Sequence, residues 1–424
     1  MIRVAWICHF SDPLVRRELS ERESATERFL VRRILRRESF SEGQDTCLWN
    51  SRGIAEFSRF PEVELHVVMP YKTLTGGLRE FTVQGIHYHC FPDQGSYFKN
   101  RLLKIFRPRK YRSCSGNVRK AARILSAVRP DIVHLIGAES RDVSVCVDSV
   151  PEGTPLVVQL QTLLSKPGFR DGYYLSDADY ELLSSIEKHA LERADFIGTT
   201  LPEYRKWIQS AICPQARFVD TKLAVGVDVD DSSAGPKDFD FVYFALHIEK
   251  SADLALEAFA LAHNEIPSLT LDIIGNSSAD FRSALEKRAG ELGVSDAIVF
   301  EGALPTHERV ISRIRQARFA LLPLKVDFIS GTIREAMANG LPVVTTVTEG
   351  TPTLNSGRES VLLSPVGDHK AMAANMLRLV REDGLAERLR SNALKTVEER
   401  YSNRSAMLNW LETYKKILEE WRSR

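Results

Sequence analysis

Polar residues between positions 327 and 335 have the composition of an anion-binding site. Ser330, Gly331 and Thr332 stand at the expected start of a helix, where several backbone N–H groups lack a partner within the helix. Such a helix end attracts anions, and phosphate is a common one. Asp327 precedes the helix and Glu335 lies one turn inside it. These residues predict a phosphate cradle flanked by two carboxylates that could hold sugar hydroxyls. The other interpretation is an ordinary α/β unit with two solvated acids.

The elements that would position these side chains form a strand–loop–helix–strand unit. Residues 332–339 are predicted to be helical because their apolar side chains share one side of a helix. Gly340 should end this helix, since glycine accepts the positive φ that a helix C-terminus often needs. Residues 341–346 then form an apolar, β-branched run, which is typical of a buried strand in a parallel sheet.

Residues 335–344 read Glu-Ala-Met-Ala-Asn-Gly-Leu-Pro-Val-Val, and Asp327 stands eight positions before them. This pattern resembles the signature of retaining GT-B glycosyltransferases of the family-4 type, in which the first acid is usually glutamate. The resemblance implies an α/β protein with two Rossmann-like, doubly wound domains that face a cleft. It implies an acceptor domain over 1–230, a nucleotide-sugar domain over 239–400, and a C-terminal helix within 401–424 that crosses back to the first domain.

The resemblance also implies an activity. A retaining enzyme would move a sugar from a nucleotide-sugar donor, first of all a UDP-sugar, to a polysaccharide, lipid-linked or other glycan acceptor. The leaving diphosphate would help to take the acceptor proton, and neither a cofactor nor a metal would be needed. The implied catalytic residues are Asp327, Glu335 and Lys250. The implied donor-binding residues are Lys250, His247, Gly275, Ser330, Gly331, Thr332 and Glu335.

One departure from the family pattern concerns the donor diphosphate. The family usually carries an arginine shortly before the lysine that matches Lys250, but residues 244–246 are Phe-Ala-Leu. A charge-assisted contact contributes roughly 1.5–3 kcal/mol, and His247 could replace it only in part. The departure therefore leaves open a catalytically degenerate partner subunit. An inverting transferase or a nucleotide-sugar epimerase is a further alternative, with His9 or Asp12 as the base that an inverting enzyme needs.

Polar side chains follow three predicted strands in the first half of the chain. His9 and Asp12 follow the first, His134 and Glu139 lie in and after the second, and Gln161 follows the third. Because ligands bind outside the carboxyl ends of strands in doubly wound sheets, all five are candidate acceptor contacts. The alternative interpretation is a set of hydrogen-bonding groups at strand ends, with Asp12 as a helix cap and His9 packed.

Residues 99–120 contain nine Lys or Arg and no acid, interleaved with Leu102, Ile105, Phe106 and Tyr111. With the aromatic pair before it, the segment 97–120 predicts either contact with an anionic membrane surface or a solvated helix face. Nucleic-acid binding is disfavoured because no nucleic-acid motif accompanies the charge.

Length and composition set broad limits. A chain of 424 residues with 43% hydrophobic and 27% charged residues favours two globular domains. Six cysteines without a C-x-x-C pair, and the lack of an 18-residue apolar run, favour the cytoplasm, with a possible peripheral position on the inner face of the membrane. His87 and His89 share one face of the strand predicted over 86–91, but no third metal ligand stands near them in the sequence.

Overall fold

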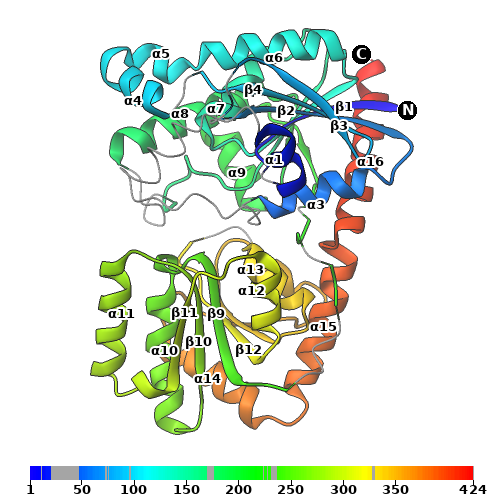
Figure 1. Cartoon of the computed structure of the whole chain (residues 1–424). Helices are drawn as coiled ribbons and strands as arrows, with labels where there is room; N and C mark the ends of the chain where they lie inside the picture. The colour runs from blue at the N-terminus through cyan, green and yellow to red at the C-terminus, as the bar shows by residue number, and fades with distance from the viewer. Residues whose placement is uncertain are drawn as a thin grey trace. The chain divides into compact units, whose positions relative to one another are not determined.

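The chain forms two compact α/β units in the computed structural model (Figure 1). The first unit comprises Met1–Ala224 and Ala406–Arg424, and the second comprises Val225–Ser405. The structure describes residues 1–10, 12–20, 47–71, 74, 76–94, 97–169, 176–222, 224–226, 228–230, 236–326 and 330–423.

The first unit is built on one sheet whose order, in the described part of the chain, is β3-β4-β2-β1-β5-β6-β7-β8. Its strands are β1 (Ile2–Ile7), β2 (Val63–Tyr71), β3 (Arg79–Val83), β4 (Ile86–Pro92), β5 (Ile132–Ile136), β6 (Leu156–Gln159), β7 (Phe196–Gly198) and β8 (Phe218–Val219). Only the β3–β4 pair among these strands is antiparallel. β1 has β2 on one side and β5 on the other, so the strand order runs in opposite directions from it. Doubly wound sheets bind ligands at such a topological switch point.

Among its described residues, the first unit has the helices α1 (Pro13–Ser20), α3 (Leu48–Phe57), α4 (Tyr97–Phe106), α5 (Pro108–Ser113), α6 (Ser115–Val128), α7 (Arg141–Ser144), α8 (Asp177–Arg193), α9 (Pro202–Ala211) and most of α16 (Asn403–Arg422). The apolar stripe of α16 completes the core, because Trp410, Leu411 and Tyr414 pack with Trp6 and Phe57. The predicted C-terminal helix that returns to the first domain is thus confirmed.

The second unit has a wholly parallel sheet in its described residues, with the order β11-β10-β9-β12-β13-β14. Its strands are β9 (Phe239–His247), β10 (Leu271–Asn276), β11 (Ile298–Gly302), β12 (Ala317–Leu322), β13 (Val343–Thr346) and β14 (Leu362–Ser364). Its helices are α10 (Ala252–Glu265), α11 (Ala279–Glu291), α12 (His307–Ile314), α13 (Gly331–Ala338), α14 (His369–Arg381) and α15 (Leu385–Arg400). The switch point of this sheet lies between β9 and β12.

The strand–loop–helix–strand unit predicted around positions 327–346 is present. α13 begins at Gly331, one residue before the predicted start, and β13 begins at Val343. Gly340 has a φ of +68°, so a glycine is needed where the helix ends. In the part of the chain that the structure describes, no helix combines the length and the apolar composition that crossing a bilayer requires.

Candidate functional site

The first candidate site lies at the carboxyl ends of β9 and β12 in the second unit. α13 begins there, and the side chain of its N-cap residue, Ser330, does not cap the helix but lies 2.7 Å from Thr332 Oγ1. A Cβ placed on Gly331 would meet no atom within 4 Å, so the space beside the first turn is open. This helix end therefore offers backbone N–H groups and the positive end of a helix dipole to an anion.

Two lysines supply positive charge at the same edge of the sheet. Lys250 is exposed at the end of a 3-10 helix, Ile248–Lys250, that follows β9, and His247 is exposed beside it. Lys325 follows β12, and its Nζ lies 2.8 Å from Asp253 Oδ2 in the first turn of α10. Lys325 could not be predicted from the sequence because no motif marks it. Only the parallel pairing of β9 with β12 brings its loop to the turn that carries Lys250.

Glu335 is the carboxylate that the structure places in this site. Its side chain is only 13% exposed, and burial raises its pKa to about 8, although Arg334 partly offsets this effect. His307, the first residue of α12, lies with Nε2 3.8 Å from Glu335 Oε1. His307 was not predicted either, since it comes from a different strand end. Asp327 lies outside the described residues, so its proposed role stays a prediction.

Gly275 is required at its position for a structural reason other than ligand binding. Its φ is +143°, and a Cβ there would stand 2.0 Å from the carbonyl oxygen of Ala245 and 2.8 Å from Ile248 Cγ2. Glycine thus allows the end of β10 to approach the turn between β9 and Lys250. Its predicted contact with the donor stays a prediction, and the structure gives it a part in positioning that turn.

The second candidate site lies at the strand ends of the first unit, next to the switch point at β1. With its amide oriented so that both neighbours are satisfied, Gln161 donates to Glu139 Oε1 at 3.2 Å and accepts from Trp49 Nε1 at 2.9 Å. Glu139 Oε2 is buried without a hydrogen-bond partner in the described structure, and burial raises the pKa of Glu139. His9 Nε2 lies 3.5 Å from Asp142 Oδ1. The structure therefore brings three predicted residues to one edge and adds Trp49 and Asp142, which no pattern in the sequence marks.

Two of the predicted acceptor residues have other roles. Asp12 caps α1, since its Oδ1 accepts hydrogen bonds from the backbone N–H groups of Leu14 at 2.8 Å and Val15 at 3.3 Å. His134 is fully buried, its Nδ1 lies 2.6 Å from the Tyr414 hydroxyl, and burial lowers its pKa to about 3. A side chain without exposed surface does not reach an acceptor, so the assignment of His134 was wrong. The position of His134 in a strand suggested a contact with the acceptor, whereas the side chain is packed under α16 and serves a hydrogen bond there.

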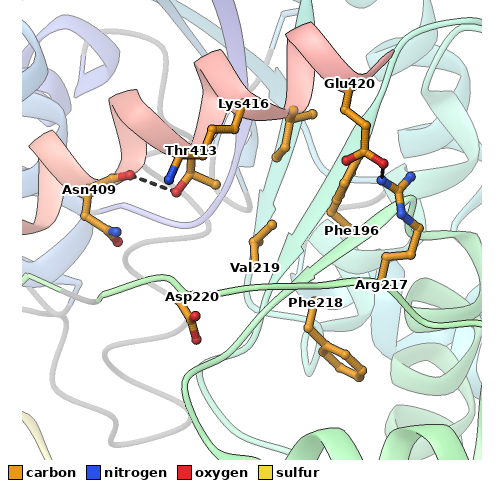
Figure 2. A pocket seen from close by; sticks show the side chains of 10 residues that line it. Phe196, Arg217, Phe218, Val219, Asp220, Asn409, Thr413, Lys416 and Glu420 are labelled. Atoms are coloured by element: carbon orange, nitrogen blue, oxygen red, sulfur yellow. Dashed lines mark hydrogen bonds and ion pairs between the residues drawn. The ribbon is translucent and has the colours of Figure 1, made fainter. Parts of the chain in front are cut away.

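A cavity of about 270 Å³ lies in the first unit between α16 and the edge strand β8 (Figure 2). It is lined by Phe196, Arg217, Phe218, Val219, Asp220, Asn409, Thr413, Lys416, Ile417 and Glu420. An ion pair between Arg217 and Glu420 closes one side, and Figure 2 shows the two side chains meeting there. None of the predicted site residues lines this cavity, and its wall mixes charged and polar side chains with four apolar ones.

Comparison with known proteins relates the second unit to glycosyltransferases. Residues 232–396 match the family model described as "Glycosyl transferases group 1". A D-inositol 3-phosphate glycosyltransferase from Frankia alni is 29% identical over 220 residues, which is 47% of this chain and 52% of that protein. The GtfA subunit of a UDP-N-acetylglucosamine–peptide N-acetylglucosaminyltransferase from Streptococcus pneumoniae is 27% identical over 215 residues, covering 49% and 41%. The chain thus spans about half the length of these curated relatives.

Among solved structures, a sucrose-phosphate synthase from Thermosynechococcus elongatus superposes with a TM-score of 0.69 over 99% of this chain and 100% of that one, at 15% identity. At such low identity the likeness concerns the fold alone. Two α/β units with parallel sheets and this structural neighbour establish the GT-B fold that the sequence predicts.

Proposed function

We propose that the chain is a retaining glycosyltransferase that transfers a sugar from a nucleotide-sugar to a glycan or lipid-linked acceptor. The observation that carries this proposal is the site at the β9–β12 switch point, where the start of α13, two lysines and the largely buried Glu335 share one sheet edge. This site lies within the residues that match the glycosyltransferase family.

Each part of the site has a chemical role in the proposed reaction. The diphosphate would bind to the first turn of α13 with Lys250 and Lys325 as the cations, and Glu335 would accept hydrogen bonds from the ribose hydroxyls. These positive groups would stabilise the charge that develops on the leaving diphosphate, which is electrostatic catalysis without a requirement for a metal. Lys325 would supply the second cation that Phe-Ala-Leu at 244–246 does not. A UDP-sugar is the proposed donor, in line with the name of the pneumococcal relative.

The acceptor would bind to the first unit. His9, Glu139 and Gln161 offer a ring nitrogen and side-chain oxygens at the strand ends beside β1, a set that suits sugar hydroxyls. The unpaired, buried Oε2 of Glu139 is an acceptor for which a hydroxyl is a fitting donor.

A thermal-shift panel with UDP, GDP, ADP and CMP tests the donor site. One nucleotide should stabilise the wild type, by about 2.7 kcal/mol at roughly 100 times its dissociation constant. Lys250→Ala and Lys325→Ala should each weaken its binding roughly 10- to 100-fold, since each removes one charge-assisted phosphate contact. Lys287→Ala is the matched control, because this lysine is 79% exposed on α11. If no nucleotide stabilises the wild type, donor binding is refuted and a degenerate partner subunit becomes the better proposal.

We also propose that the segment 97–120 contacts an anionic membrane surface, which would place the protein on the inner face of the cytoplasmic membrane. Leu102, Ile105 and Phe106 on α4 are 55%, 64% and 75% exposed. Arg107 and Arg109 are exposed directly after them. Exposed apolar side chains beside cationic ones are what an interfacial helix presents to acidic lipid.

Sedimentation with liposomes tests this contact. The wild type should pellet with vesicles containing anionic lipid at low salt and be released by salt, since screening weakens attraction to the surface. Ile105→Ser with Phe106→Ser should reduce the bound fraction several-fold. Val366→Ser, at an apolar residue 46% exposed in the second unit, should not. Equal binding to neutral and anionic vesicles, or equal binding by both variants, would contradict the proposal.

A further inference from the structure

Three histidines and two glutamates gather on one face of the sheet in the first unit. His66 on β2 pairs with His87 on β4, and Glu80 on β3 pairs with His89 on β4. Glu64 precedes His66 by two residues, so it points to the same face. The opposite face carries the apolar core. No third ligand stands near His87 and His89 in the sequence because the further ligands come from β2, which pairs with β4 in the sheet.

The side chains of Glu64, His66 and His87 converge. One ligand atom from each lies within 4.8 Å of the other two. The rings of His66 and His87 stack with their centroids 4.7 Å apart. Zinc binds imidazole nitrogen and carboxylate oxygen at about 2.0–2.2 Å, so its ligand atoms stand at most about 4 Å apart. A small inward movement of these side chains would suffice. We propose that Glu64, His66 and His87 form a binding site for a divalent transition metal, with Zn²⁺ as the best match to two imidazoles and one carboxylate.

The groups behind His66 support this site. His66 Nδ1 lies 3.0 Å from His89 Nε2, and His89 Nδ1 lies 2.7 Å from Glu80 Oε1. With a metal on His66 Nε2, the Nδ1–H of His66 donates to His89, and the Nδ1–H of His89 donates to Glu80. Each of these two hydrogen bonds then has one donor and one acceptor. Metal-binding histidines usually have such a partner behind them, which fixes the tautomer and the ring orientation.

The carboxylate of Glu64 stands at the nitrogen of His66 that faces away from His89. His66 Nε2 lies 3.0 Å from Glu64 Oε1, so these two proposed ligands are already in contact. Arg3 Nε contacts Glu64 Oε1 at 3.1 Å, which leaves Glu64 Oε2 for the metal. Three protein ligands leave a fourth position for water.

Equilibrium titration with Zn²⁺ tests the proposal on the full chain after treatment with a chelator. The wild type should bind one Zn²⁺ at this site, and His66→Gln or His87→Gln should weaken that binding at least 100-fold. His89→Gln should weaken it about 10- to 100-fold, because His89 acts through His66. His189→Gln is the control, since this exposed histidine pairs with Asp148 away from the cluster. His87 is only partly buried, so its variant remains informative if the His66 variant fails to fold.

Co²⁺ gives a second readout because its visible spectrum reports the geometry and the nature of its ligands. The wild type should show the intense bands of a four-coordinate Co²⁺ site, and Zn²⁺ should remove them. His87→Gln should lose them. The proposal is overturned if the wild type binds no metal at low micromolar concentration, or if His66→Gln and His87→Gln bind Zn²⁺ as the wild type does.

Discussion

Nucleotide binding should strengthen as the pH rises towards 8, and Glu335→Gln should abolish this dependence. Burial raises the pKa of Glu335 to about 8, so below that pH the folded protein without ligand holds this carboxyl mainly protonated. The proposed contact with ribose hydroxyls uses the carboxylate, which accepts stronger hydrogen bonds than the neutral acid. If binding requires the ionised form, affinity rises up to about tenfold per pH unit below the pKa and levels off above it.

Calorimetric titration between pH 5 and pH 9 measures this effect. The ligand should be the nucleoside of whichever nucleotide stabilises the wild type, because a nucleoside has no phosphate that titrates in this range. Glu291→Gln, at a partly exposed glutamate on α11, should keep the pH dependence of the wild type. A pH-independent affinity in the wild type would contradict the assignment of Glu335 to the ribose.

Stability without ligand gives a separate check on the same carboxyl. Because its folded pKa exceeds its unfolded one, the contribution of Glu335 to the free energy of unfolding falls as the pH rises from about 4.5 to 8. Each pKa unit corresponds to about 1.4 kcal/mol. Glu335→Gln should therefore stabilise the protein by an amount that grows over this range and amounts to a few kcal/mol above it. If Glu335→Gln is more stable than the wild type but binds nucleotide equally well, the raised pKa of Glu335 is supported and its role in binding is refuted.

Tyr414→Phe should destabilise the first unit by about 2–5 kcal/mol. The Tyr414 hydroxyl accepts a hydrogen bond from Trp6 Nε1 at 2.8 Å and donates to His134 Nδ1 at 2.6 Å. All three side chains are buried, and each polar group left without a partner costs about 1–3 kcal/mol. The substitution removes one oxygen and hardly changes the packing, so the loss reports the hydrogen bonds.

Tryptophan fluorescence during urea unfolding measures this loss in the first unit alone. All five tryptophans of the chain, at positions 6, 49, 207, 410 and 421, belong to that unit. In a double-mutant cycle, Tyr414→Phe should cost about 1 kcal/mol less in a Trp6→Phe background, because the Trp6 donor is then already absent. Additive losses would show that the Trp6–Tyr414 bond contributes nothing.

Much of the fold could be predicted because local sequence encodes it. Short-range rules for helices and strands account for the apolar runs before Gly340 and at β13, for the positive φ at Gly340, and for the apolar stripe of α16. The GT-B resemblance ordered these elements into two doubly wound units. Details of start and end differ by a residue or two, as at α13, which begins at Gly331 although residues 332–339 were predicted to be helical.

The sites were predicted only where one loop carries them. Ser330, Gly331 and Glu335 lie within a single segment, so spacing along the chain identified them. Lys325 and His307 join that site from other strand ends, and periodicity carries no information on such neighbours. His134 shows the opposite error, since a polar residue in a strand can serve a buried hydrogen bond as well as a ligand.

The discontinuity of the first unit has a consequence for biosynthesis. Domains usually fold from the N-terminus onward as the ribosome releases them. Here Val225–Ser405 is continuous, whereas Trp410 and Tyr414, which complete the core around Trp6, are translated after it. The second unit can therefore fold on the ribosome while the first unit still exposes the apolar surface that α16 later covers. We expect nascent chains stalled before position 406 to bind chaperones through residues near the start of the sequence, and the first unit to complete its core only after the second unit has folded.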